Sequence, residues 1–348
     1  MKRLFQYSHY LLICAGFLLA VSIYRWTFDE ASTVRIIPLV DKTKHREETI
    51  SRHPPCSCTR PLLSLSTGIM NSTFSSLCSN YSTLRGFHQR VISISMYHSR
   101  ANARFSMNTS MNYLDKLIHD MKSKYPEWIL RIYHDETIPS DLICSTECTH
   151  HFVDFCNTSS LGQLGRLRSY IPGKIWRFLP IGDELVDIIA SRDLDSPLTQ
   201  REIDAVNDWL SSNKAWHVMR DHPLHVAPML GGMWAFRPAF NRTFAENLRK
   251  KMLDRSSISR YGGVGDQTFL TDNIWPYIQR DLIAHDSFLC QTSYGRNSRA
   301  WPTRRPSLSN ETHCFVGCVR PCCISMKYPF QHCPVACRPS NHTDWNFC

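Results

Sequence analysis

Short apolar runs alternate with longer helical patterns through the middle of the chain. Four runs have the length and β-branched content of strands, at residues 90–97, 127–135, 150–157 and 186–190. Between the first two, apolar residues recur at helical spacing over 112–126. Strands that alternate with a helix predict an α/β fold with a mixed, mostly parallel sheet and helices on both faces.

The second half of this region continues the alternation. Thr199 and Glu202 have the spacing of a capping box, which predicts a helix beginning there. Residues 225–238 suggest a short strand entered through paired glycines, and 261–278 a glycine loop that leads into a helix. Because the loop lacks a Gly-Lys-Ser/Thr ending, a P-loop nucleotide site is excluded.

The N-terminus has the pattern of a membrane signal-anchor. Lys2 and Arg3 precede a stretch from Leu4 to Tyr24 without Asp, Glu, Lys or Arg, which is about one bilayer long. The flanking charges predict a cytoplasmic tail and a lumenal remainder. A cleaved signal peptide, cut near Ser22, is the alternative.

Cysteines and N-glycosylation sequons also favour the secretory pathway. Seven Asn-x-Ser/Thr sites occur in the chain, and fourteen of the fifteen cysteines lie beyond the apolar stretch. Eight of these cysteines lie between Cys290 and Cys348, where a disulfide-rich module is expected and a zinc site is the weaker alternative. The predicted organisation is a tail and anchor at 1–25, a stem at 26–85, a catalytic domain at 86–290 and a cysteine-rich module at 291–348.

The net charge of +10 comes from basic residues that are spread along the chain. Nucleic-acid-binding proteins usually concentrate such residues in a stripe. We therefore expect no nucleic-acid partner, and the dispersed excess suits an anionic small substrate.

The stretch SRDLDS raises the question of a metal site. Asp193 and Asp195 follow the apolar run at 186–190 and, at positions i and i+2 of an extended segment, point the same way. Ligands of α/β sheets bind beyond the carboxyl ends of the strands, where these two residues are expected. The alternative is an ordinary turn with two surface aspartates.

Residues 90–290 resemble a DxD-containing, GT-A-fold glycosyltransferase-like family, and their motif order is distantly similar to the glycogenin-like transferases. The resemblance is carried by YPEWILRIYHD, WRFLPIGDELVDIIASRDLDS, HVMRDHPLHVAPMLGGMWAF and GVGDQTFL. It implies transfer of a sugar from a nucleotide-sugar donor to a glycan or glycoconjugate acceptor, with Mn²⁺ or Mg²⁺ and plausibly with retention of configuration. A late His-x-x-Gly-x-x-Lys signature is absent.

The resemblance also assigns roles to particular residues. Asp195 is expected to bind the metal directly, and Asp193 to bind the metal, the donor ribose or a metal-bound water. His285 is the expected third ligand, with Asp286 as the alternative. The other expected site residues are Gly231, Gly232 and Trp234 at the donor-sugar and acceptor pocket, Asp266 and Gln267 near the transferred sugar, Arg166, Arg168 or Arg177 at the diphosphate, and Tyr97 on the base.

These observations favour a single-pass type II Golgi glycosyltransferase. Two other functions stay open: a catalytically silent GT-A-like protein that binds glycans or partners through the cysteine-rich tail, and a metal-dependent phosphoesterase. The phosphoesterase interpretation is weak because the sequence offers no second carboxylate/histidine cluster for a two-metal site.

Overall fold

The computed structural model describes residue 56 and residues 58–60, 74–98, 106–161, 164–292, 294–295, 298–305, 315–322 and 331–348. The predicted anchor at 1–25 lies outside these residues. Within the described part of the chain, no helix is long and apolar enough to cross a membrane.

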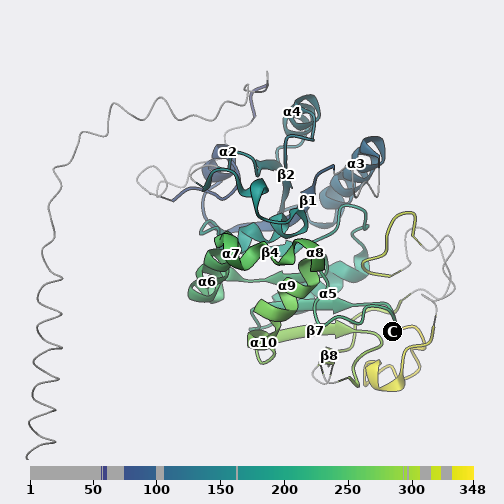
Figure 1. Cartoon of the computed structure of the whole chain (residues 1–348). Coiled ribbons are helices and arrows are strands. Elements are labelled where there is room, and N and C mark those ends of the chain that lie inside the picture. Colours follow the sequence, from purple (N-terminus) through teal and green to yellow (C-terminus); the bar gives the residue numbers. More distant parts are fainter. Residues whose placement is uncertain are drawn as a thin grey trace, which may run out of the picture. The chain divides into compact units, whose positions relative to one another are not determined.

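One sheet organises the described residues (Figure 1). It is built from eight strands in the order β3-β2-β1-β4-β6-β5-β7-β8, and only β6 runs against its neighbours. The strands are β1 (Gln89–Met96), β2 (Ile129–His134), β3 (Val153–Asn157), β4 (Val186–Ser191), β5 (Trp216–Arg220), β6 (Trp234–Phe236), β7 (Leu282–Asp286) and β8 (Ser298–Arg299). The predicted mixed, mostly parallel sheet is confirmed.

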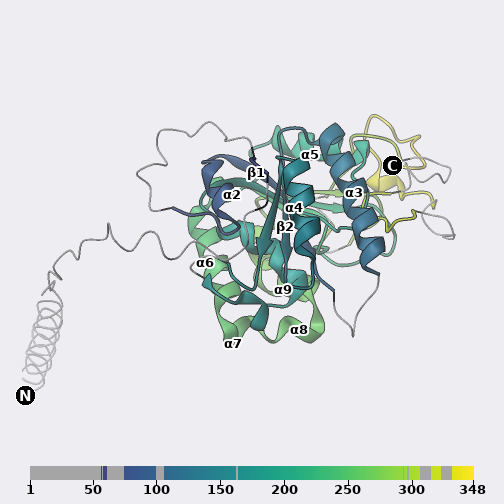
Figure 2. The same cartoon turned by 90° about the horizontal axis from the view of Figure 1, so that it is seen from above.

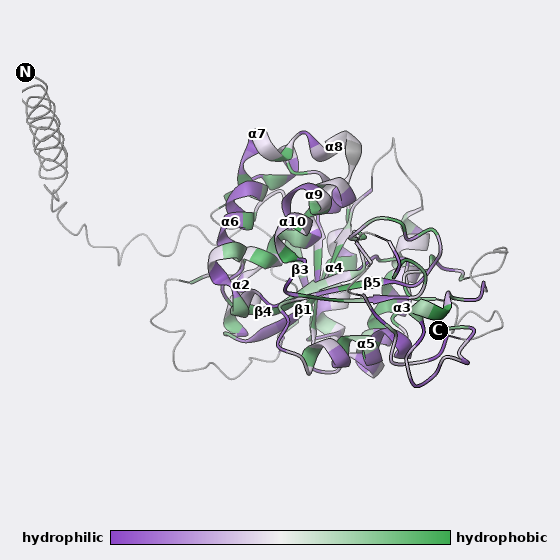
Figure 3. Ribbon diagram, turned by 90° about the horizontal axis from the view of Figure 1, so that it is seen from below, coloured by the Kyte–Doolittle hydropathy of each residue, from purple (hydrophilic) through white to green (hydrophobic). Residues whose placement is uncertain are grey.

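Helices cover both faces of the sheet. One face packs against α3 (Met107–Lys124), α4 (Ser140–Thr149) and α5 (Gln200–Leu210), and Figure 2 shows α3 and α5 on the opposite side of the molecule from α6 and α7. The other face packs against the 3-10 segment η3 (Gly173–Gly182), α6 (Arg242–Leu253) and the helices that follow it (Figure 3). The remaining helices are α2 (Asn80–Leu84), α7 (Arg255–Ile258), α8 (Tyr261–Val264), α9 (Asp266–Asn273) and α10 (Trp275–Ile278). Both apolar faces of the sheet are thus removed from water.

The start of α5 confirms half of the predicted capping box. The Thr199 hydroxyl accepts a hydrogen bond from the Glu202 backbone N–H at 3.2 Å. The Glu202 side chain does not return to the helix start. It is buried, accepting from Arg192 at 2.6 Å and from the Tyr125 hydroxyl at 3.0 Å. The buried Arg192 guanidinium would be strongly destabilising without a carboxylate partner, whereas the N–H groups at the helix start can bond to water.

The order of the strands creates a topological switch point. From β1 the chain moves outward to β2 and β3, and then returns to place β4 on the other side of β1. The loops after β1 and β4 therefore diverge at the same edge of the sheet. In open α/β sheets such a crevice is the usual ligand site.

Disulfides join three cysteines of the predicted stem to the sheet-bearing part of the chain. Cys56 pairs with Cys144 and Cys58 with Cys148, both on α4, while Cys78 pairs with Cys156 on β3. The C-terminal pairs are Cys290–Cys337, Cys318–Cys322 and Cys333–Cys348. Every cysteine in the described residues is paired, as expected for a protein of the secretory pathway.

Peptide mapping under non-reducing conditions tests this pattern. We expect the linked peptides Cys56–Cys144, Cys58–Cys148 and Cys290–Cys337 to be recovered from the purified protein. Free thiols at Cys290 and Cys337, together with bound zinc, would instead support the metal alternative.

Two buried histidines predict loss of stability in mild acid. His217 Nε2 lies 2.8 Å from His285 Nδ1, and His285 Nε2 lies 3.1 Å from Asp208 Oδ2. Burial lowers the pKa of both imidazoles, and that of His217 falls well below its usual range because His285 and Arg192 lower it further. For His285, Asp208 partly offsets the burial, while Arg299 and Arg201 act with it.

Both rings are therefore neutral in the folded chain, whereas unfolded histidines take up protons near pH 6.5. The two histidines do not reduce the free energy of unfolding above that pH. As the pH decreases below it, the free energy of unfolding falls by about 1.4 kcal/mol per pH unit for each such histidine. Denaturant unfolding from pH 7.5 to 5 measures the slope. His217→Asn should make it shallower, while His119→Asn, at an exposed position on α3, should not. Equal slopes in all three proteins would contradict this account.

Candidate active site

The carboxyl edge of the sheet gathers most of the residues predicted to form a site. Tyr97 follows β1, and Asp193 and Asp195 follow β4. Because β6 is antiparallel, its amino end, with Gly231 and Gly232 just before it, lies at the same edge. The polar groups therefore meet at the switch point.

Arg177 is the centre of the cluster. Its Nη1 donates to Asp193 Oδ1, and its Nη2 donates to Asp266 Oδ2 at 2.5 Å. The backbone carbonyl of Arg192 accepts a further bond from Nη1 at 2.9 Å. Burial alone would lower the pKa of Arg177, but the facing Asp193 and Asp266 carboxylates raise it above its ordinary value. The guanidinium is a fixed positive charge between two carboxylates.

The two carboxylates differ in access to solvent. The side chain of Asp193 is 43% exposed, whereas those of Asp266 and Arg177 are 9% and 8% exposed. Asp266 begins α9, where its carboxylate also accepts from the backbone N–H of Gln267 at 3.1 Å. Asp193 is therefore the member of this cluster that a ligand can reach.

Gly231 and Gly232 make this arrangement possible. A Cβ atom on Gly231 would overlap the Asp266 carboxylate and the Arg177 guanidinium, and one on Gly232 would overlap the Asp193 carboxylate. The Gly231 carbonyl accepts from the Ser191 hydroxyl at 2.7 Å, which fixes the glycine pair to the end of β4. These glycines are required for close approach.

Residues 315–322, from the cysteine-rich region, lie against the turn that carries Asp195. The Arg320 backbone N–H donates to the Asp195 carbonyl at 2.8 Å. The Arg320 guanidinium contacts the Asp120 carboxylate at 2.5 Å. The backbone carbonyl of Arg320 accepts a hydrogen bond from the Tyr113 hydroxyl at 2.8 Å. Asp195 itself is buried. Sequence reasoning did not connect the tail with the DxD turn.

A second group of charges lies beyond β1 and β2. Arg168 Nε is 3.0 Å from Asp135 Oδ2, and its Nη1 contacts Glu136; both acidic residues follow β2. Tyr97 is half-buried, and its ring packs edge-on against Trp176 at 5.2 Å. Burial raises the pKa of Tyr97, with smaller effects from Arg177, Asp266 and Asp135. Asp193 and Asp195 were selected because they follow a strand. Asp135 and Glu136 follow β2 in the same way, so the same criterion would have identified them.

The two candidates for a third metal ligand lie apart from the cluster. His285 is three strand positions from β4, about 14 Å across the sheet, and both its ring nitrogens are engaged by His217 and Asp208. Asp286, its alternative, is buried against Arg220 at 2.6 Å. The structure therefore does not bring a third ligand from β7 to the DxD turn.

Trp234 is fully buried, with its ring 5.1 Å from Phe178 and 5.9 Å from Trp216. Its side chain is part of the core, and only its backbone carbonyl, which accepts from Arg192, is close to the DxD strand end. Gln267 is exposed beside Asp266. Arg166 is also exposed, and its backbone carbonyl accepts from the Ser169 hydroxyl at 2.9 Å.

The donor groups suit a hard divalent cation that is completed by a ligand. Mg²⁺ and Mn²⁺ sites commonly use one or two carboxylates together with substrate phosphates. Asp193 offers an accessible carboxylate, and Gly232 leaves the space beside it free of a side chain. Within the described residues, no group of three His, Cys, Asp or Glu side chains is placed to hold a metal alone. The residues present therefore fit a cation that binds together with a phosphate-bearing ligand.

Comparison with known proteins gives distant structural matches. No protein-family model and no curated protein matches the chain. Apo mouse xyloside xylosyltransferase 1 is 13% identical, with a TM-score of 0.36 over 60% of this chain and 91% of that one. The mannosyltransferase PcManGT from Pyrobaculum calidifontis, in complex with GDP-Man and Mn²⁺, is 12% identical, with a TM-score of 0.32 over 56% of this chain and 55% of that one. A 4-diphosphocytidyl-2C-methyl-D-erythritol synthase from Anaerococcus prevotii is 12% identical, with a TM-score of 0.29 over 50% and 84% of the two chains.

Proposed function

We propose that the chain is a divalent-metal-dependent glycosyltransferase that moves a sugar from a nucleotide-sugar donor to a glycan or glycoconjugate acceptor. One observation carries this proposal: an accessible aspartate of a DxD turn, a buried arginine and a glycine pair meet at the switch point between β1 and β4. That crevice is where nucleotides bind in sheets of this type. The match to known transferases is too distant to carry it.

Each group has a role in this proposal. Asp193, with Asp195 behind it, would hold Mn²⁺ or Mg²⁺, which when bound neutralises charge on the diphosphate leaving group. Arg177 would hold Asp193 in place and present positive charge toward the donor. Tyr97 would stack on the base, and Arg168 lies near enough to Asp135 and Glu136 to orient them toward the nucleoside. Asp266 and Gln267 would lie beside the transferred sugar.

The proposed location is the Golgi membrane, with the catalytic part in the lumen. The described disulfides support an oxidising compartment, and the apolar stretch before Tyr24 supplies the anchor. Retention of the intact chain in carbonate-washed membranes tests the anchor. Quantitative secretion of a chain beginning near Ile23 would favour a cleaved signal peptide.

The second candidate function is a catalytically silent protein of the same fold. The Arg177–Asp193 contact favours it, because the cation must compete with a buried guanidinium for the same carboxylate. A silent protein would keep this ion pair and bind glycan without turnover.

Donor hydrolysis distinguishes the two functions. The purified chain is incubated with a panel of UDP-, GDP- and CMP-sugars, with Mn²⁺ or with EDTA, and release of the nucleotide is measured. The transferase proposal expects at least one donor to be cleaved only with the metal. Glycan binding without cleavage of any donor would support the silent protein instead.

A further inference from the structure

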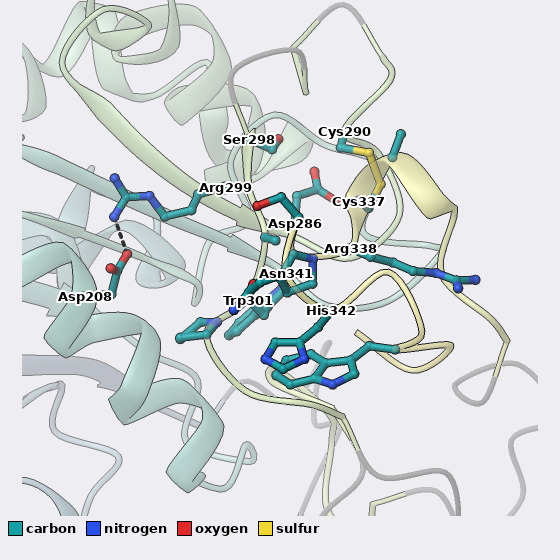
Figure 4. Close-up of a pocket in the computed structure, with 16 residues that line it drawn as sticks. Asp208, Asp286, Cys290, Ser298, Arg299, Trp301, Cys337, Arg338, Asn341 and His342 are labelled. Carbon is teal, nitrogen blue, oxygen red and sulfur yellow. Dashed lines mark hydrogen bonds and ion pairs between the residues drawn. A yellow bond between two sulfur atoms is a disulfide. The ribbon is translucent and has the colours of Figure 1, made fainter.

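A cleft lies at the far edge of the sheet, away from the switch point (Figure 4). It has a volume of about 520 Å³, within the usual range of about 300–1,000 Å³ for small-molecule sites. One wall is formed by β8 and the residues after it, and the other by residues 336–345 of the cysteine-rich region. Cys290–Cys337 joins the two walls covalently.

The sheet-side wall offers paired hydrogen-bonding groups. Arg299 Nη1 donates to Asp208 Oδ2 at 2.6 Å, and His285 lies against the same oxygen. Among the described residues, no hydrogen bond reaches Asp208 Oδ1 or Arg299 Nη2. The two side chains are 30% and 50% exposed. Asp208 can therefore accept, and Arg299 beside it can donate, a hydrogen bond to a ligand. Two neighbouring hydroxyl groups of one ligand would satisfy both.

The opposite wall offers an aromatic platform. The rings of His342 and Trp345 are stacked, with centroids 4.3 Å apart and an interplanar angle of 11°, and both side chains are half-buried. Trp301, which follows β8 in the sheet-side wall, is fully buried, and among the described residues its Nε1 has no hydrogen-bond partner. The half-buried rings of His342 and Trp345 are therefore the aromatic surface that a ligand can reach.

Two of the charged groups in the cleft are already compensated or held. Arg299 is neutralised by Asp208. Arg338 keeps its positive charge, but its guanidinium is held by the backbone carbonyls of Cys333 and Thr343. Asp286 is buried against Arg220. A ligand that suits this lining is neutral, with an apolar face for the rings and hydroxyl groups for the Asp208–Arg299 pair. Carbohydrates have both properties.

We propose that this cleft is an oligosaccharide-binding site, separate from the proposed transferase site. Two kinds of oligosaccharide could occupy the cleft. One is a free glycan, such as the acceptor of the transferase. The other is the chain's own N-glycan at Asn341, an exposed sequon residue that lines the cleft.

Binding of the full chain to a printed array of defined neutral oligosaccharides tests the proposal without any donor or metal. We expect the wild type or Asn341→Gln to bind a subset of the array. Trp345→Ala should weaken this binding about tenfold through loss of the aromatic contact. Arg299→Gln, which keeps the wall but removes the charge pair, is a second variant in case Trp345→Ala does not fold.

Trp275→Ala is the matched control, because Trp275 is also half-buried but lies on α10, outside the cleft. Stronger binding by Asn341→Gln than by wild type assigns the cleft to the chain's own glycan, and equal binding assigns it to a free glycan. The proposal is overturned if neither protein binds any neutral oligosaccharide, or if Trp345→Ala and Arg299→Gln bind as well as Trp275→Ala does. Asp193→Asn should bind the array normally, so loss of transfer and loss of glycan binding are distinguishable.

Discussion

Asp193→Asn should lower the rate of sugar transfer by about 100- to 1,000-fold, which is the usual cost of losing electrostatic stabilisation at a developing charge. Asn has nearly the shape of Asp but no charge, so the cation would lose its accessible anionic ligand. Asp195→Asn should also reduce transfer. Metal-dependent donor binding, measured by titration calorimetry, should weaken together with the rate.

The fold should tolerate the change at Asp193. Asn still accepts a hydrogen bond from Arg177, and Arg177 keeps its contact with Asp266. We expect the free energy of unfolding to change by about 1 kcal/mol, the difference between a charge-assisted and a neutral hydrogen bond. Asp204→Asn on α5, where the carboxylate accepts from Gln200 at 2.9 Å, is the control and should change neither activity nor stability. A double variant at Asp193 and Asp195 that keeps Mn²⁺-dependent transfer would end this assignment.

Local sequence patterns predicted much of the first half of the sheet. The β-branched run at 90–97 became β1, and the apolar repeat at 112–126 became the buried face of α3. β5 was missed because WHVMR is short and all five residues are buried, which leaves no alternation to detect. The strand expected at 225–238 is three residues long, since its first part turns to bring the glycine pair to the site.

The candidate site could be predicted where polar residues follow a strand end, but not where side chains from distant parts of the sequence meet. Asp193 and Asp195 were identified because they follow an apolar run. The contact between Arg177 and Asp266 joins residues 89 positions apart, and periodicity carries no information about it. His285 was expected from motif order alone, but sheet order places β7 three strands from the DxD turn. The packing of Arg320 beside Asp195 depends on how the cysteine-rich region folds back.

Gly232→Ala should abolish most transfer although it removes no functional group. Its Cβ would overlap the Asp193 carboxylate and lie 3.0 Å from the Asp193 backbone nitrogen. Relief of this overlap requires Asp193 to turn away from Arg177 or the DxD turn to move. Overpacking of this kind costs about 1–3 kcal/mol of stability. The rate should fall about as far as in Asp193→Asn, because the same carboxylate is displaced.

The comparison with Gly262→Ala and Gly263→Ala isolates this effect. Both glycines are in α8, and a Cβ atom on either meets nothing within 4 Å. Alanine there should keep full activity and, because helical glycine is unfavourable, raise stability by up to about 1 kcal/mol. Rates and unfolding free energies of the three variants, measured together, test whether space beside Asp193 matters. Full activity in Gly232→Ala would mean that Asp193 does not need its observed position for transfer, and the metal-binding role proposed for it would fail.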